Sequence, residues 1–81
     1  MHKEQDKALY YSEKAYRIAK IKNLDLSQIM YVYLNLATAL WNNKKYSSLK
    51  KICKEAITVN NNYMDFFYYL GNVYSMMGET D

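Results

Sequence analysis

The sequence lacks proline and holds only two glycines and one cysteine among its 81 residues. Because proline and glycine interrupt helices most often, their scarcity favours helical segments along the whole chain. The single cysteine, Cys53, excludes a disulfide within the chain and favours a reducing compartment, for which the cytoplasm is the default. No long uncharged apolar run follows the charged start MHKEQDK, so the sequence predicts neither a signal peptide nor a membrane span.

The residues needed for catalysis are also scarce. One histidine, His2, and one cysteine cannot build a metal site or a Cys–His nucleophilic pair, and the sequence has no glycine-rich phosphate loop. Glu4 and Asp6 lie too close to the terminus to form an organised acid–base pair. Cys53 falls on an apolar stripe, which favours a buried packing thiol over a nucleophile. We therefore expect a protein that is not an enzyme and needs no cofactor.

The chain is rich in apolar residues, which make up 51% of it, and in helix formers. Hydrophobic periodicity predicts four helices, over residues of about 4–22, 28–42, 46–59 and 63–77. Asp25 or Ser27 is placed to cap the second helix, and Gly78 to end the fourth in the left-handed conformation. The short connections predict antiparallel helical hairpins, and hence an all-α fold.

Each expected helix carries an apolar stripe. In the first helix the stripe contains Ala8, Tyr11, Ser12, Ala15, Ile18 and Ala19. In the second it contains Met30, Tyr33, Leu36, Ala37 and Leu40. In the third it contains Leu49, Ile52, Cys53, Ala56 and Ile57. In the fourth, the core face is expected at Leu70, Gly71 and Tyr74.

The second and fourth stripes repeat each other. A shift of 34 residues maps Met30 to Met64, Tyr33 to Phe67, Leu36 to Leu70, Ala37 to Gly71 and Leu40 to Tyr74. Such a period in a chain of helical hairpins indicates a solenoid. A mid-helix glycine costs about 1 kcal/mol relative to alanine. We therefore interpret Gly71 as a close packing contact, and expect Gly71→Leu to cost more stability than helix propensity alone explains.

The spacing also resembles a known family. Phe67-x2-Leu70-Gly71-x2-Tyr74, followed by Gly78, resembles the first helix of a tetratricopeptide (TPR) repeat, with Phe67 in the place of the family's tryptophan. A second, more degenerate repeat is similar to Tyr33-x2-Leu36-Ala37-x2-Leu40 with Tyr46, Leu49, Cys53 and Ala56. Ala8-x3-Ser12-x2-Ala15 resembles the second helix of a preceding repeat. The resemblance implies a single TPR-like domain over residues 1–81.

The chain departs from the family pattern at several points. Asn61 stands where the family usually has proline, Lys44 where it has a turn glycine, and Leu49 where it has alanine. About seven extra residues follow Ala15 before the next repeat, which we interpret as two more turns of helix. The chain opens on a second-type helix and closes on a first-type one. We therefore expect a piece of a longer solenoid, with self-association through the terminal helices as the alternative.

The resemblance implies that the first helix of each hairpin lines a concave groove. The side chains expected there mix aromatic, amide and hydroxyl groups: Tyr31, Leu34, Asn35, Thr38, Trp41, Asn42, Asp65, Tyr68, Tyr69, Asn72 and Met76. Asparagine side chains can hydrogen-bond both groups of a peptide backbone, and Tyr and Trp supply contact area. We expect a protein or peptide partner in this groove. The alternative is that Trp41, Tyr68 and Tyr69 pack against neighbouring repeats.

Three other functions are considered. Some TPR co-chaperones clamp acidic C-terminal tails; Asn35 matches that clamp, but Asp65 and Tyr69 stand where it needs Lys and Arg, which disfavours it. The second is the sensory part of a bacterial peptide-responsive transcription regulator, to which the long repeat spacing is similar. The third is a structural self-association fragment. Lysines at positions 44, 45, 50, 51 and 54 indicate a solvated outer face rather than a phosphate patch, so nucleic acid is not expected.

Overall fold

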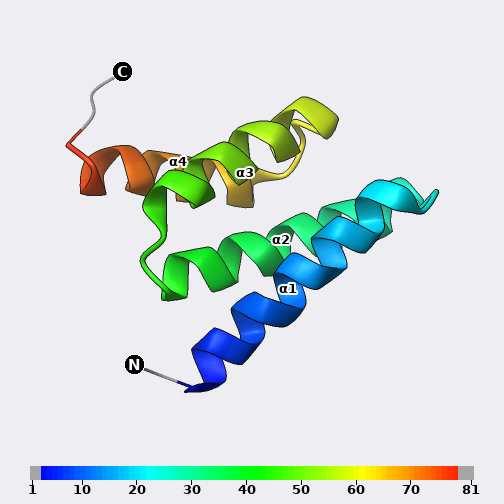
Figure 1. Cartoon of the computed structure of the whole chain (residues 1–81). Coiled ribbons are helices and arrows are strands. Elements are labelled where there is room, and N and C mark those ends of the chain that lie inside the picture. Colours follow the sequence, from blue (N-terminus) through cyan, green and yellow to red (C-terminus); the bar gives the residue numbers. More distant parts are fainter. Residues whose placement is uncertain (1–2, 79–81) are drawn as a thin grey trace.

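Four helices make up the computed structural model, which describes the backbone of residues 3–78 and the side chains of residues 7–78. The helices are α1 (Lys3–Ile21), α2 (Leu26–Asn42), α3 (Tyr46–Val59) and α4 (Met64–Met76), and the described residues include no strand (Figure 1). The all-α prediction is confirmed, and each predicted boundary falls within two residues of the observed one. His2 and the side chains of Glu4 and Asp6 lie outside the described residues.

The helices form two hairpins in a flat arrangement of 37 × 32 × 16 Å. Each helix packs on the next, and α2 also contacts α4, so α2 touches all three other helices (Figure 1). None of the described helices has the length and apolar character needed to cross a membrane.

Local sequence explains where the helices begin and end. The Asp25 carboxylate accepts a hydrogen bond from the Gln28 backbone N–H at 2.9 Å, and the Gln28 side chain accepts one from the Asp25 N–H, a capping box that starts α2. Gly78 follows α4 with φ +71°, as predicted. Lys44, which stands where the TPR pattern has a turn glycine, has φ +59°. This left-handed conformation is costly for a residue with a Cβ.

The extra residues of the first hairpin extend both of its helices. Measured from Ala15, α1 continues to Ile21, whereas α3 continues from Ala56 only to Val59. Relative to α4, α2 likewise begins about one turn earlier. The prediction of two more turns of helix is therefore confirmed, with about one turn added to each helix.

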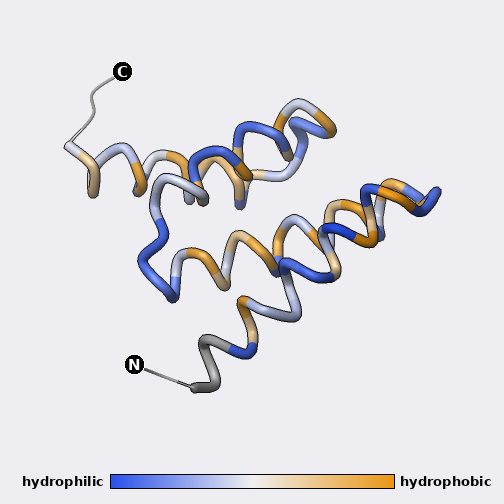
Figure 2. Tube along the Cα trace, viewed as in Figure 1, coloured by the Kyte–Doolittle hydropathy of each residue, from blue (hydrophilic) through white to orange (hydrophobic). Residues whose placement is uncertain are grey.

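The core centres on α2 and α3, as their stripes predict. Its fully buried side chains include Met30 and Ala37 from α2, and Leu49, Cys53 and Ala56 from α3. Figure 2 shows hydrophobic residues along the length of α2.

The predicted core face of α4 is wrong at Gly71, whereas Leu70 is partly buried against the core. Phe66 and Val73 are fully buried, whereas Phe67 is 43% exposed and Gly71 is exposed. A Cβ added to Gly71 would meet no atom within 4 Å, so Gly71 makes no close packing contact in the described chain. The physical reason is that the buried face of α4 carries Phe66, whose ring lies 6.5 Å from that of Tyr33 in α2, and this leaves Gly71 on the outer side.

The predicted apolar stripe of α1 is likewise not the face of that helix that packs in the core. Leu9 is 8% exposed and is the α1 residue in the core, with Tyr16 packed beside it. Ala8, Tyr11 and Ala15 are exposed. The outer helices thus bury a face adjacent to the one that the repeat pattern indicates.

Candidate functional site

A groove of about 460 Å³ lies between α1 and α2. We call it the α1–α2 groove, and its lining residues are Ala8, Tyr11, Ser12, Ala15, Tyr31, Val32, Asn35, Thr38, Ala39 and Asn42. Four of these, Tyr31, Asn35, Thr38 and Asn42, are among the predicted binding residues. The structure therefore gathers the polar part of the α2 prediction at one site, together with α1 residues that the prediction did not include.

The other two predicted binding residues of α2 pack partly against the core. Leu34 and Trp41 are half-buried against the core. The Trp41 ring lies 5.9 Å from the ring of Tyr69, and the Tyr69 hydroxyl is 3.1 Å from the Thr38 hydroxyl. Trp41 and Tyr69 thus join α2 to α4, and this pairing uses much of the aromatic surface assigned to a partner.

The predicted residues on α4 do not line the α1–α2 groove. Asp65, Tyr68 and Met76 are exposed, Tyr68 to 71% and Met76 to 57%. The Asn72 amide donates a hydrogen bond to the Tyr68 carbonyl at 2.8 Å within the helix. These side chains form a surface separate from the groove.

The chemistry of the groove lining is neutral and amphipathic. None of its ten lining residues is charged, and they combine alanines with tyrosines, amides and hydroxyls. Asn35 and Asn42 are exposed, so their amides are accessible from solvent. Alanines permit close approach of a backbone, while amides can satisfy its N–H and C=O groups. The lining suits an uncharged polypeptide segment better than an acidic one.

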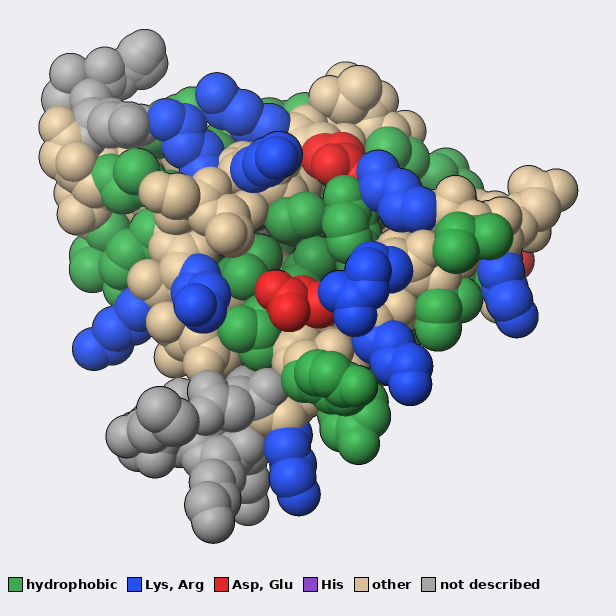
Figure 3. All heavy atoms as spheres, in the orientation of Figure 1, with side chains coloured by type: hydrophobic (Ala, Val, Ile, Leu, Met, Phe, Trp, Pro, Cys, Tyr) green, Lys and Arg blue, Asp and Glu red, His purple; other side chains and the backbone are tan. Residues whose placement is uncertain are grey.

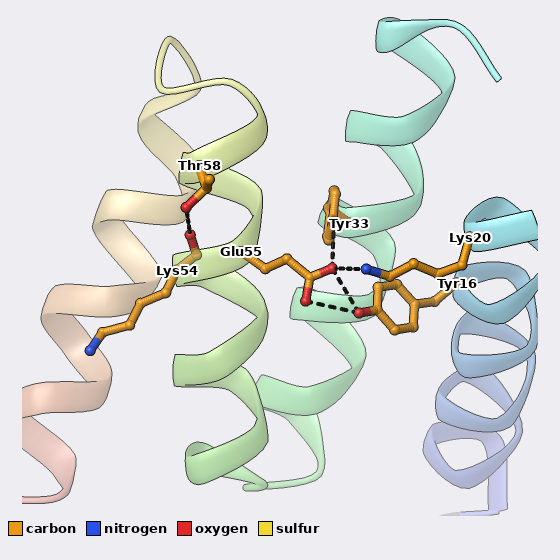
Figure 4. Close-up of polar contacts among 6 residues, drawn as sticks. All are labelled: Tyr16, Lys20, Tyr33, Lys54, Glu55 and Thr58. Carbon is orange, nitrogen blue, oxygen red and sulfur yellow. Dashed lines mark hydrogen bonds and ion pairs between the residues drawn. The ribbon is translucent and has the colours of Figure 1, made fainter. Parts of the chain in front are cut away.

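A polar cluster around Glu55 was not predicted from the sequence. Glu55 extends from α3 and accepts hydrogen bonds from the Tyr33 hydroxyl at 2.6 Å, the Tyr16 hydroxyl at 2.7 Å and the Lys20 ammonium at 2.5 Å (Figure 4). Its donors come from α1 and α2, so one carboxylate connects three helices. The local signal was that Glu55 is the one acidic residue in a lysine-rich segment, residues 43–58.

The contacts within the cluster shift the pKa values of its members. Burial alone would raise the pKa of the Glu55 carboxyl, but hydrogen bonds from Lys20, Tyr33 and Tyr16 outweigh it and lower that pKa. Burial, followed by the hydrogen bond to Glu55, raises the pKa of both Tyr33 and Tyr16. At neutral pH the carboxylate is therefore ionised and already holds three donors, which suits a structural anchor rather than a proton acceptor.

The other residues considered for chemistry have structural surroundings. Cys53 is a free, fully buried thiol, and burial raises its pKa to about 12, so the packing interpretation is confirmed. Among the described residues, no three His, Cys, Asp or Glu side chains gather as metal ligands would. Lys44, Lys45 and Lys51 are exposed, and basic side chains are spread over the face seen in Figure 3. Lys50 lies over the Tyr74 ring, 5.1 Å from its centre.

Comparison of the chain with protein-family models finds no match, and comparisons with curated proteins and with solved structures find none either.

Proposed function

We propose that the chain is a non-catalytic, TPR-like protein-interaction module that holds a polypeptide segment in the α1–α2 groove. The observation that carries the proposal is the composition of the groove. It offers about 460 Å³ lined by small apolar residues, and the amides of Asn35 and Asn42 stand beside them. Ligand pockets in general combine an apolar lining with a few convergent polar groups.

The neutral lining narrows the class of segment. An acidic tail would need Lys or Arg in the site, and the lining supplies neither. It offers alanines to apolar side chains, and hydroxyls and amides to a backbone or to uncharged polar groups. The proposed ligand is therefore an amphipathic segment without net negative charge at the contact.

A displayed peptide library tests the proposal. Peptides are selected on the full chain and then screened against Ala15→Arg and Asn35→Arg, which place a bulky cation in the groove at exposed positions. We expect selected peptides to bind the wild-type chain and to lose at least tenfold in affinity on both variants, about 1.4 kcal/mol. The control is Ser47→Arg, an exposed α3 position outside the groove lining. Equal binding to all four proteins would refute the proposal.

A further inference from the structure

Within the chain, α2 packs on a surface formed by α3 and α4, which we call the α2 docking surface. Its floor comes from α3, where Leu49, Ile52, Cys53 and Ala56 are all buried. Its wall comes from α4. There Phe66 meets the Tyr33 ring at 6.5 Å, and Tyr69 meets both Thr38 and Trp41.

The α1–α2 groove repeats this construction. A shift of 41 residues maps the α3 floor, in order, onto Ala8, Tyr11, Ser12 and Ala15. A shift of 34 residues maps the wall residues Phe66 and Tyr69, and the buried Val73 on the same helix, onto Val32, Asn35 and Ala39. All seven of these counterparts line the groove. The groove is therefore a second copy of the α2 docking surface, and a helix that resembles α2 is suited to occupy it.

The helix that resembles α2 is α4. The five stripe residues of α2, from Met30 to Leu40, are at most 5% exposed. Their counterparts form what we call the α4 stripe: Met64, Phe67, Leu70, Gly71 and Tyr74. Met64 is 75% exposed, Phe67 is 43% exposed, Gly71 is exposed, and Leu70 and Tyr74 are half-buried. A contiguous apolar stripe of this kind marks an interaction surface.

The charges of the two ends are complementary. Residues 1–25 hold six basic and four acidic side chains, a net charge of +2. Residues 59–81 hold three acidic side chains and no basic one, a net charge of −3. The α4 stripe itself is uncharged, as the neutral groove lining requires. Around it, the opposite net charges of the two ends favour contact between the α1 end of one molecule and the α4 end of another, whereas pairing of two α4 ends brings like charges together.

We infer that the α1–α2 groove receives α4 of a second copy of this chain, so that molecules associate head to tail. The inference rests on the proposed function, because it names the occupant of the same groove. In this arrangement Phe67 of the second copy packs on Val32, as Tyr33 packs on Phe66. Asn72 of the second copy meets Asn35, as Thr38 meets Tyr69. An assembly of any length keeps one unused groove at one end and one unused α4 stripe at the other, so the association has no built-in end.

Two complementary variants of the full chain test this arrangement by sedimentation. Ala15→Arg blocks the groove and Gly71→Arg blocks the α4 stripe; both positions are exposed, and an added Cβ at Gly71 meets nothing within 4 Å. Over a range of about 10 µM to about 1 mM we expect the wild-type mass to rise without a plateau. We expect each variant alone to be a monomer and their equimolar mixture to form a dimer that grows no further. Ser47→Arg controls for the added charge and should associate like wild type.

Several outcomes would overturn the inference. A monomeric wild-type chain over the whole range, or a mixture that stays monomeric while the wild-type chain associates, contradicts head-to-tail docking. Association of Ala15→Arg alone would show contact through two α4 stripes instead. Asn35→Arg repeats the groove arm if Ala15→Arg loses its helical circular dichroism. A monomeric wild-type chain that still binds selected peptides in the groove would remove this inference and leave the proposed function standing.

Discussion

The Glu55 cluster allows a quantitative prediction about stability. Tyr33→Phe, Tyr16→Phe and Lys20→Met each remove one donor to the Glu55 carboxylate with little change in the rest of the side chain. The three bonds have similar lengths but different surroundings, since Tyr33 is 5% exposed, Tyr16 is half-buried and the Lys20 side chain is 53% exposed. Burial, rather than distance, should therefore set the order of the three effects.

The expected magnitudes follow from that order. A hydrogen bond from a buried donor to a charged acceptor contributes about 1.5–3 kcal/mol, so Tyr33→Phe should lower the free energy of unfolding by about 2 kcal/mol. We expect about 1 kcal/mol for Tyr16→Phe, because water can replace part of its bond. An exposed ion pair contributes about 0–1 kcal/mol, so Lys20→Met should cost about 0.5 kcal/mol. A chain of this size has a total stability of about 4–12 kcal/mol, so all three variants should still fold.

Urea unfolding followed by circular dichroism measures these differences, at about 5 µM to keep association low. Each substitution is also made in a Glu55→Ala background, and the double-mutant cycle isolates its coupling to Glu55. The coupling should be largest for Tyr33 and smallest for Lys20. Equal couplings, or the largest one for Lys20, would refute the view that burial controls the strength of these bonds.

The pH dependence of the same cluster has a definite sign. The pKa of Glu55 is lower in the folded chain than its ordinary value of 4.5. Its contribution is therefore fully present above about pH 4.5 and is lost as the pH falls through the lowered value. Glu55→Gln should remove this part of the acid sensitivity while leaving that of the other carboxyls. An unchanged acid-unfolding profile in Glu55→Gln would contradict the assigned pKa direction.

The remaining predictions concern the backbone. Lys44→Gly should raise the free energy of unfolding by about 1 kcal/mol, because glycine adopts φ +59° without the Cβ penalty. Urea unfolding measures the change, with Lys45→Gly as the control, and a lower stability of Lys44→Gly would contradict this prediction. Gly71→Ala should stabilise the dilute monomer by about 1 kcal/mol through helix propensity, since its Cβ meets no atom; a loss of stability would restore the close contact that the sequence suggested. Asp25→Ala should cost about 1 kcal/mol by removing the cap of α2, whereas Ser27→Ala should be nearly neutral. Equal losses in these two variants would locate the cap elsewhere.

The sequence predicts the helices and the middle of the core well, because both depend on local pattern. Met30, Ala37 and Cys53 lie on stripes whose partners are adjacent hairpin helices of the same chain, and all three are fully buried. The Glu55 cluster escaped prediction because its partners Tyr16 and Tyr33 are 39 and 22 residues away, and no local spacing links them.

The outer helices were misread for a different reason. The stripe pattern of α4 predicts a core face at Leu70, Gly71 and Tyr74, but a pattern indicates only that a face is suited to a partner. Within the described chain the side of α4 that faces the core carries Phe66 and Val73, with Phe66 against Tyr33 of α2, so those residues are buried instead. Among the predicted binding residues, Asn35 and Asn42 line the groove, whereas Trp41 lies against α4. Sequence spacing alone does not decide between these two positions.

The exposed stripes of α1 and α4 therefore have one physical origin. Each is the counterpart of one half of the buried α2–α3 interface, so each is built for burial against a helix that the other could supply. Leaving both in water forgoes about 25 cal/mol for every square ångström of apolar surface that contact would bury. Gly71 fits this account, because its counterpart Ala37 is fully buried in the core. A small residue at this point of α4 is unnecessary in the isolated chain and useful only when a second helix approaches closely, as the α1–α2 groove permits.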